Sequence, residues 1–197
     1  MLYLLSPELF PHPFFAALFT VASLGIVAVE LRIFLKKSIP GAEHKDKSSL
    51  FVVLGGVAAF IFLLWYFSYA RIGIIHSALA SYIGFGMLFS GFFIRQWAIQ
   101  TLDDYFTPIV SLQYDHVLID GGPYRFVRHP AYTGLMLELA GAALAARNGA
   151  ALAAVFVCVV PSLLYRVWVE EKALREKFED AYRSYQRKTK RFIPYIL

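Results

Sequence analysis

The sequence predicts an all-α integral membrane protein with five transmembrane helices, the last two forming a hairpin, together with a polar loop and a C-terminal amphipathic helix. Hydrophobic residues make up 58% of the 197 positions and charged residues only 17%, whereas soluble domains average about 45–50% and about 25%. Several apolar stretches approach the roughly 20 residues that a helix needs to cross a bilayer. Cys158, the single cysteine, lies in an apolar run, so neither a disulfide framework nor a Cys-based metal site is expected.

Four apolar stretches are interpreted as transmembrane helices. They are Phe14–Leu35, Leu50–Tyr69, Ala78–Trp97 and Ala150–Trp168. A fifth, Thr133–Ala146, is short, contains Glu138, and reaches full length only if it begins inside the sequence HPAY that precedes it. The sequence Arg147-Asn148-Gly149 then predicts a tight turn into the last span. Pro161 is expected to kink that span, which neighbouring helices tolerate in a membrane.

The chain is expected to form one membrane domain over residues 1–197. Two spans occupy residues 1–77, and residues 78–197 form a core that contains a polar loop (98–132) and a tail helix (169–190). Span three carries small residues four positions apart, Ala80 with Gly84 and Gly86 with Ser90. This spacing predicts close packing against another helix; a slot for a cofactor is the alternative interpretation.

The C-terminal tail predicts an amphipathic helix that lies on the membrane or across the polar loop. Apolar residues recur at helical spacing between its charged residues: Leu174, Phe178, Ala181, Tyr182 and Tyr185. Arg166 and Glu170 are four positions apart where the last span leaves the membrane. A charged pair is costly there unless protein buries it for a purpose.

Basic residues are divided unequally between the two sides of a five-span arrangement. Of the 19 Lys and Arg residues, all but Arg71 and Arg147 fall on one side. Cytoplasmic loops are the ones enriched in Lys and Arg, so the N-terminus is expected outside and the polar loop and C-terminus in the cytoplasm. We interpret the net charge of +5 as a basic face towards anionic lipid headgroups rather than nucleic acid.

The polar loop contains the sequence GGPYRFVRHPAYTG, residues 121–134, which a plain connection does not need. Taken singly, its residues have ordinary explanations as lipid-phosphate anchors, interface aromatics or a helix start: Arg125 and Arg128, Tyr124 and Tyr132, and Pro130. Glu138 in the short span is either a functional carboxylate or the partner of a neighbouring Arg. His116 and His129 lack a carboxylate or Cys partner at ligand spacing, so no metal is expected.

Taken together, these residues resemble the isoprenylcysteine carboxyl methyltransferase family and its compact prokaryotic relatives over about residues 95–197. The first motif reads His116-Val117-Leu118-Ile119, then Tyr124, then His129-Pro130-Ala131-Tyr132. The second reads Arg166, Glu170-Glu171, an aromatic-rich helix and the basic ending KRFIPYI. Two ordered motifs at matching spacing are far more specific than a single His-Pro.

The resemblance implies methyl transfer from S-adenosylmethionine, with S-adenosylhomocysteine as the product, at a cytoplasmic membrane of prokaryotic type. It implies that the cofactor is contacted by His116, Val117, Leu118, Ile119, Tyr124, His129, Pro130, Ala131, Tyr132 and Glu170. Arg166 is the expected substrate-binding residue. The candidate catalytic residues are Arg166, Glu170 and Glu171.

The sequence departs from the family pattern at two places. Asp103-Asp104 in TLDDYFT stand where relatives usually have a Gly after the Leu, and Glu179 replaces the usual Gly after Phe178. Neither place belongs to the cofactor motif. The first is expected to bear on the acceptor side of the site.

The chemistry of these residues is compatible with methyl transfer. A sulfonium methyl is transferred by direct displacement, so an enzyme mainly holds donor and acceptor in line. A carboxylate acceptor is already ionised near neutral pH and needs no general base, and the guanidinium fork of Arg166 fits it. An amine or alcohol acceptor would need a base, for which Glu171 and Glu138 are the candidates.

Several acceptors and two other functions stay open at this point. The acceptor is expected to be lipophilic: an isoprenylcysteine-like or other lipidic carboxylate on a small molecule or prenylated substrate, or a phospholipid amine. The alternatives are an NADPH-dependent membrane sterol or lipid reductase and a non-catalytic membrane scaffold. No Gly-rich loop follows a strand, which excludes doubly wound nucleotide-binding domains. We expect membrane lipids as surroundings, no nucleic acid and no obligate protein partner.

Overall fold

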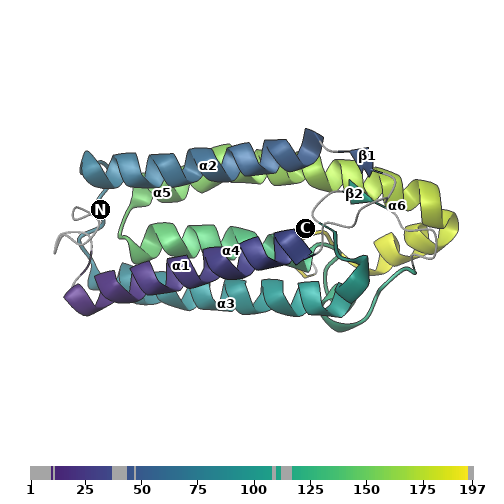
Figure 1. Ribbon diagram of the computed structural model, residues 1–197, viewed down its shortest axis with the longest axis horizontal. Helices are drawn as coiled ribbons and strands as arrows, with labels where there is room; N and C mark the ends of the chain where they lie inside the picture. The colour runs from purple at the N-terminus through teal and green to yellow at the C-terminus, as the bar shows by residue number, and fades with distance from the viewer. Residues whose placement is uncertain are drawn as a thin grey trace.

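The structure is a computed structural model that describes residues 10, 12–36, 44–46, 48–107, 110–111 and 117–194. The chain forms an elongated bundle of helices that run along one axis (Figure 1). Its main helices are α1 (Pro13–Lys36), α2 (Ser48–Tyr69), α3 (Ala78–Leu102), α4 (Pro130–Ala145), α5 (Gly149–Ala154) and α6 (Val160–Lys188). Two short strands, β1 (His44–Asp46) and β2 (Val110–Ser111), pair antiparallel between the α1–α2 connection and the loop after α3.

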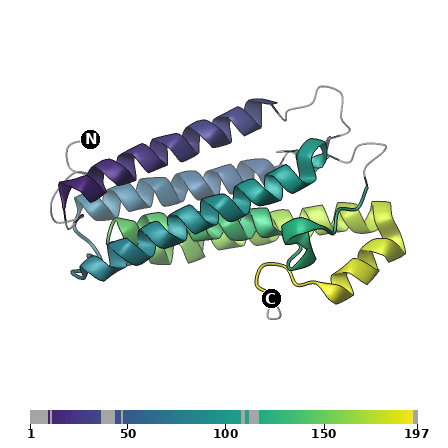
Figure 2. The ribbon, with the colours of Figure 1, turned by 90° about the horizontal axis from the view of Figure 1, so that it is seen from below.

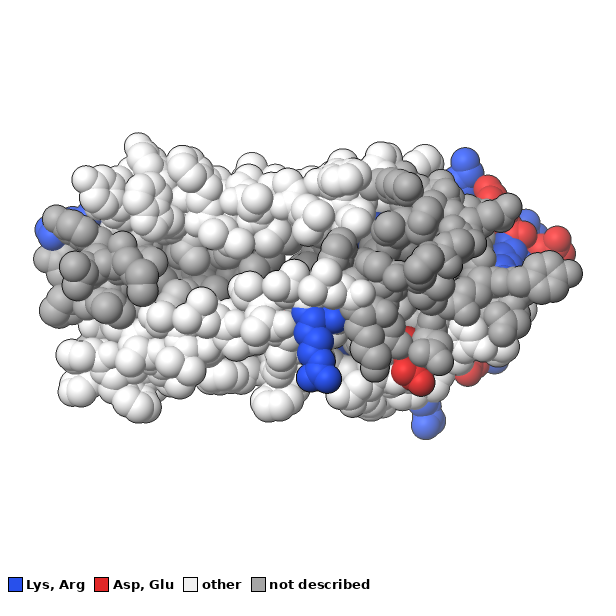
Figure 3. Space-filling view, viewed as in Figure 1, with Lys and Arg blue, Asp and Glu red and all other residues white. Residues whose placement is uncertain are grey.

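Four segments are long and apolar enough to cross a membrane: Pro13–Ile33, Ser48–Tyr69, Ala78–Leu102 and Gly149–Lys188. They match four of the five expected spans and identify a multi-pass membrane protein. The expected fifth span corresponds to α4, which begins inside HPAY as anticipated but has only 16 residues. In Figure 3 the charged side chains of the visible face gather mainly where α6 ends, and the surface along the bundle is largely uncharged.

Helices α3 and α4 pack backbone against backbone, which confirms the packing interpretation of Gly84. A Cβ atom on Gly84 would lie 2.1 Å from the amide nitrogen of Ala145, so no larger residue fits. One on Gly91 would lie 2.6 Å from the amide nitrogen of Glu138, and one on Gly134 2.7 Å from Cβ of Arg95. Because these contacts run in opposite directions along the two helices, α3 and α4 are antiparallel. Gly86 has open space around it and takes no part in this contact.

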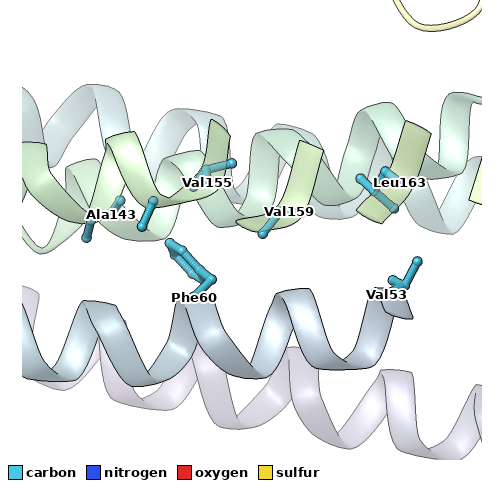
Figure 4. Close-up of a cluster of buried hydrophobic side chains, with 8 residues drawn as sticks. Val53, Phe60, Ala143, Val155, Val159 and Leu163 are labelled. Atoms are coloured by element: carbon cyan, nitrogen blue, oxygen red, sulfur yellow. The ribbon is translucent and has the colours of Figure 1, made fainter. Parts of the chain in front are cut away.

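The core between α2 and the last helices is a cluster of buried apolar side chains (Figure 4). Its labelled members are Val53 and Phe60 from α2, Ala143 from α4, and Val155, Val159 and Leu163. Val155–Val159 is a π-helical segment that ends just before Pro161. A proline removes one backbone donor and clashes with the preceding turn, so the expected disturbance at Pro161 takes the form of a wider helical turn.

Helices α4 and α5 are joined by a short turn built by the sequence Arg147-Asn148. Arg147 has a φ of 51°, and its Nε donates to the carbonyl of Ile75 at 2.9 Å. The side chain of Asn148 caps α5 by accepting from the amide of Ala151 at 2.8 Å. The tight turn expected here is therefore present, stabilised by side chain–backbone hydrogen bonds.

The tail helix is continuous with the last span and then reverses. Helix α6 runs to Lys188, but Glu179 inside it has φ 43° and ψ −115°. Figure 2 shows the last part of α6 folded back towards the loop that follows α3. Asp103, at the end of α3, has nearly the same conformation, with φ 45° and ψ −116°. The two departures from the family pattern are thus the two places where the backbone takes a conformation typical of glycine.

Candidate functional site

A cavity opens at the end of the bundle where α6 reverses, with an empty volume of about 890 Å³ including its mouth. Small-molecule pockets occupy ~300–1,000 Å³. The cavity is lined by the end of α3, the polar loop, the start of α4 and α6. The lining side chains that carry the argument are Ile119, Tyr124, Tyr132, Arg166, Glu170 and Tyr182. Segments from both expected motifs therefore meet at one cavity.

Arg166, Tyr132 and Glu170 form a hydrogen-bonded chain on the wall of this cavity. Nε of Arg166 donates to the Tyr132 hydroxyl at 2.9 Å, and that hydroxyl donates to Oε2 of Glu170 at 2.8 Å. Arg166 is only 5% exposed. The costly Arg-Glu arrangement at the end of the last span is thus buried in protein, with a tyrosine between the two charges.

A second hydrogen bond holds the other end of the guanidinium. Nη1 of Arg166 donates to the hydroxyl of Ser49 at 2.9 Å. Ser49 is the second residue of α2 and is fully buried. The cavity wall therefore includes a contact from the N-terminal half of the chain.

Three tyrosines give the cavity an aromatic side. The Tyr185 hydroxyl donates to the carbonyl of Tyr124 at 2.7 Å, which fastens the reversed end of α6 to the polar loop. Burial, reinforced by nearby Glu170, raises the pKa of the Tyr124 phenol well above its usual value, so it stays neutral near pH 7. Tyr182 is 1% exposed, and its hydroxyl has no hydrogen-bond partner among the described residues.

Glu171 lies behind the cavity wall and joins three segments. Its carboxylate accepts from Nε of Arg128 at 3.0 Å and from Nη2 of Arg191 at 2.8 Å, and Nε2 of His129 lies 3.4 Å from it. Glu171 follows the apolar part of α6, which ends at Trp168. Burial alone would raise the pKa of this carboxyl, but the hydrogen bonds from His129 and Arg191 and the charge of Arg128 hold it below the usual value.

The backbone reinforces the contact between the loop and the C-terminal segment. The amide of Arg128 donates to the carbonyl of Lys190 at 2.7 Å, and the amide of His129 to that of Arg191 at 3.0 Å. The guanidinium of Arg128 also donates to the carbonyls of Gln186 and Thr189. We call the set of Arg128, His129, Glu171 and Arg191 the tail clamp.

Most of the expected cofactor residues meet at the cavity. Leu118, Ile119, Tyr124, His129, Ala131, Tyr132 and Glu170 line it, as does Arg166. Val117 is 56% exposed, and Pro130 is buried at the start of α4, outside the lining. Glu171 is held in the tail clamp rather than facing the cavity. His116 lies outside the described residues.

Sequence reasoning missed Ser49 and the roles of Arg128, Tyr182 and Tyr185 at this cavity. Tyr182 and Tyr185 were assigned only to the apolar face of an amphipathic helix. The reversal that turns this face onto the loop had one sequence signal, the position after Phe178 where relatives have Gly. Ser49 gave no signal, since a single Ser at the edge of an apolar stretch is common.

Glu138 lies away from the cavity, in the interface between α3 and α4. It is buried, and its Oε1 has no hydrogen-bond partner among the described residues. Arg95 of α3, which is near it, binds Glu30 of α1 with both forks, at 2.6 and 2.8 Å. The Arg of this region is thus paired with a carboxylate from α1.

Comparison with known proteins gives one consistent family. The model of the isoprenylcysteine carboxyl methyltransferase (ICMT) family matches residues 83–176. A probable protein-S-isoprenylcysteine O-methyltransferase of Oryza sativa subsp. indica is 31% identical over 118 residues, which cover 59% of this chain and 62% of the rice protein. Protein-S-isoprenylcysteine O-methyltransferase A of Arabidopsis thaliana is 28% identical over 164 residues, 81% of this chain and 83% of that protein.

Other relatives are covered less completely. The Saccharomyces cerevisiae protein-S-isoprenylcysteine O-methyltransferase is 33% identical over 121 residues, but the match covers only 50% of the yeast protein. The chain therefore spans less than two thirds of the length of the rice and yeast relatives. A solved structure of the eukaryotic intramembrane Ras methyltransferase ICMT shares the fold, with a TM-score of 0.55 at 24% identity, over 77% of this chain and 54% of that one.

Proposed function

The chain belongs to the isoprenylcysteine carboxyl methyltransferase family, and we propose that it transfers a methyl group from S-adenosylmethionine to the carboxylate of a lipophilic acceptor. The acceptor is an isoprenylcysteine-like compound or another lipidic carboxylate. The observation that carries the proposal is the buried Arg166–Tyr132–Glu170 chain on the wall of a cavity with aromatic sides.

The cavity suits the chemistry of S-adenosylmethionine, which supplies an electrophilic methyl group on a sulfonium. Aromatic faces such as those of Tyr124 and Tyr185 attract cations, and Leu118 and Ile119 offer apolar surface to an adenine ring. The carboxylate of Glu170 is partly exposed and suits an ammonium or ribose hydroxyl. The partnerless hydroxyl of buried Tyr182 is the kind of group that a polar ligand satisfies.

Arg166 is the residue proposed to bind the acceptor. Its guanidinium is oriented by Tyr132 and Ser49, and a bound carboxylate would gain a charge-assisted hydrogen bond from it. Because such a carboxylate is already ionised near neutral pH, no general base is needed. The remaining work of the chain is to hold the reactants in line and to exclude water. The tail clamp serves the second purpose by holding the reversed end of α6 against the loop.

The proposed membrane arrangement has five crossings. Helix α4 serves as a short crossing packed inside the bundle, and the turn at Arg147-Asn148 makes α4 and the α5–α6 segment a hairpin. The cavity and the C-terminus face the cytoplasm in this arrangement, because only Arg71 and Arg147 of the basic residues lie at the opposite end. An acceptor with an apolar chain would then approach from the bilayer with its carboxylate at the interface.

The test is calorimetric binding followed by an acceptor assay with detergent-purified protein. S-adenosylmethionine, S-adenosylhomocysteine and NADPH are titrated into the native protein and into Tyr124→Ala and Glu170→Gln. We expect the first two ligands to bind, both variants to bind them more weakly, and NADPH to give no heat. Methyl transfer from labelled cofactor to N-acetyl-S-farnesylcysteine is then measured against a phospholipid amine as the competing acceptor.

The outcomes separate the alternatives. Binding of NADPH instead would assign the protein to membrane reductases, and transfer to the amine would replace the carboxylate acceptor. In the amine case a base becomes necessary, and Glu171→Gln and Glu138→Gln should then abolish transfer. If no ligand binds to folded protein, the proposal fails and the scaffold function takes its place.

A further inference from the structure

We infer that Ser49 of α2 is a positioning residue for Arg166, so that the first turn of α2 is part of the acceptor site. This inference rests on the proposed function of Arg166. Ser49 lies outside residues 83–176, which the family model matches. It belongs to a helix otherwise made of apolar side chains that face lipid or the core.

The contact between Ser49 and Arg166 is buried on both sides. Nη1 of Arg166 lies 2.9 Å from the Ser49 hydroxyl, Ser49 is fully buried, and Arg166 is nearly so. A buried ionised donor without an acceptor is strongly disfavoured. The hydroxyl of Ser49 therefore fixes where one arm of the guanidinium points.

The location of Ser49 makes this acceptor more important than a serine elsewhere. The first turn of a helix presents unpaired N–H donors and a partial positive charge, an unfavourable neighbour for a guanidinium. The Ser49 hydroxyl oxygen is the polar atom that lets Arg166 approach this turn. Alanine at the same position would leave Nη1 facing donors.

Arg166 is held at two points, and this explains why orientation matters. Ser49 fixes Nη1, and Tyr132 fixes Nε while donating to Glu170. Two fixed points define the plane of the guanidinium. With one of them lost, Arg166 can rotate away from the acceptor while Tyr132 and Glu170 keep their own hydrogen bond. The expected defect is therefore in the use of the acceptor and not in cofactor binding.

The β1–β2 ladder supports the same conclusion from the backbone. Strand β1 lies just before α2 in the chain, and it pairs with β2 in the loop after α3. The start of α2 is thus connected to the polar loop by a backbone ladder and to α6 by the Ser49–Arg166 contact. The two N-terminal spans contribute to the site through this end of α2.

The experiment compares Ser49→Ala with Ser68→Ala as a matched control. Ser68 is also buried on α2, but about 28 Å from Ser49 at 1.5 Å per residue, and it accepts a hydrogen bond from Asn148 at the other end of the helix. Purified protein is assayed with N-acetyl-S-farnesylcysteine, and S-adenosylhomocysteine binding is measured by calorimetry. We expect Ser49→Ala to raise the KM for the acceptor about tenfold and to change the Kd for S-adenosylhomocysteine less than about twofold. Ser49→Thr, which keeps the hydroxyl, should restore much of the loss.

A second measurement needs no acceptor. Phenylglyoxal modifies accessible arginines, and mass spectrometry of peptides gives its extent at Arg166 with buried Arg95 as the internal reference. Arg166 should become several-fold more reactive in Ser49→Ala, and Arg95 should not. If Ser49→Ala does not fold, Ser49→Cys, with a similar volume and a weaker acceptor, replaces it.

Each result bears on one proposal. If Ser49→Ala matches Ser68→Ala in KM and in Arg166 labelling, Ser49 has no positioning role and the inference is overturned. A parallel rise in the Kd for S-adenosylhomocysteine would mean that Ser49 supports the whole cavity, which also overturns it. If native protein transfers no methyl group to the probe, the proposed function fails for that acceptor, and the labelling result alone decides the inference.

Discussion

At the level of single residues, the cavity is set apart by what its polar groups bind. Tyr185 hydrogen-bonds a backbone carbonyl, whereas Tyr182, three positions earlier, is buried with its hydroxyl unpartnered among the described residues. The two side chains are chemically identical and lie on one helix, with ring centroids 6.0 Å apart. They therefore form a natural pair for separating a structural tyrosine from a ligand-binding one.

Removing these two hydroxyls should change stability in opposite directions. Tyr185→Phe loses a buried hydrogen bond and should lower the free energy of unfolding by about 1 kcal/mol. Tyr182→Phe removes a partnerless polar atom and should leave that free energy unchanged or raise it by up to about 1 kcal/mol, while weakening S-adenosylhomocysteine binding about threefold or more. Thermal unfolding and calorimetry measure both quantities. Equal destabilisation by the two variants would show that Tyr182 has a partner within the protein.

Glu171 was expected to be catalytic, and its surroundings favour a structural task. Glu171→Gln keeps the shape but removes the charge that faces Arg128, His129 and Arg191. It should lower the free energy of unfolding by about 2–4 kcal/mol and expose residues near Lys190 to proteolysis. Arg183→Gln is the control, because Arg183 pairs with Asp180 on the exposed surface and such pairs contribute ~0–1 kcal/mol. A stable, protease-resistant Glu171→Gln that loses only catalysis would restore the catalytic assignment.

The same carboxyl predicts how stability depends on pH. The pKa of Glu171 is lowered in the folded protein, so its contribution is present above the unfolded pKa of about 4.3 and is lost as the pH falls below that value. Arg128 and Arg191 stay charged throughout, and His129 and Glu170 also face the group. The stability difference between native protein and Glu171→Gln should thus be constant from pH 7 to about 5 and shrink below pH 4. A difference that already shrinks between pH 7 and 6 would point to His129 instead.

At the level of helices, hydropathy and length located most of the architecture. The apolar stretches predicted α1, α2 and α3 to within a few residues, because a lipid-facing helix must be apolar along its whole length. HPAY correctly marked the start of α4, since Pro favours the first turn of a helix. The continuation of the last span into the tail and its reversal were not predicted, because amphipathic periodicity is the same in a straight and in a folded-back helix.

The reversal at Glu179 and the turn at Asp103 predict two stabilising substitutions. Both residues have positive φ with ψ near −115°, a region that costs little only for glycine. Glu179→Gly and Asp103→Gly should each raise the free energy of unfolding by about 1 kcal/mol, since both side chains are exposed. Glu176→Gly, inside α6, is the control and should destabilise by a similar amount. Destabilisation by Glu179→Gly would mean that its side chain matters more than its backbone.

At the level of the whole molecule, the parts of the site that escaped sequence reasoning are those made by contacts between distant segments. Ser49 meets Arg166 across 117 positions, and Glu171 meets Arg191 only because α6 reverses. Motif spacing locates residues within one segment, and it does not show which hydroxyl on another helix will satisfy a buried Arg. The cofactor motif was therefore visible in the sequence, while its supports became visible only in the fold.

Helix α1 provides the last test, because it lies on the outside of the bundle (Figure 2) and faces its surroundings along most of its length. Its polar tie to the core is the bidentate pair of Glu30 with Arg95, and Arg95 also donates to the carbonyl of Ala131 at 3.2 Å, next to the cavity. In a double-mutant cycle, Glu30→Gln and Arg95→Gln should each destabilise, with a coupling energy of about 1–3 kcal/mol.

Activity should divide the two variants of this cycle. Arg95→Gln loses the hydrogen bond to Ala131 as well as the tie to α1, so methyl transfer should fall several-fold. Glu30→Gln keeps Arg95 in place, and the buried carboxylate of Glu138 can take over as its partner, so transfer should fall much less. Adding Glu138→Gln to Glu30→Gln should then reduce transfer to the level of Arg95→Gln. Equal activity of Glu30→Gln with and without Glu138 would show that Glu138 does not act as the second partner, and that α1 is held by Glu30 alone.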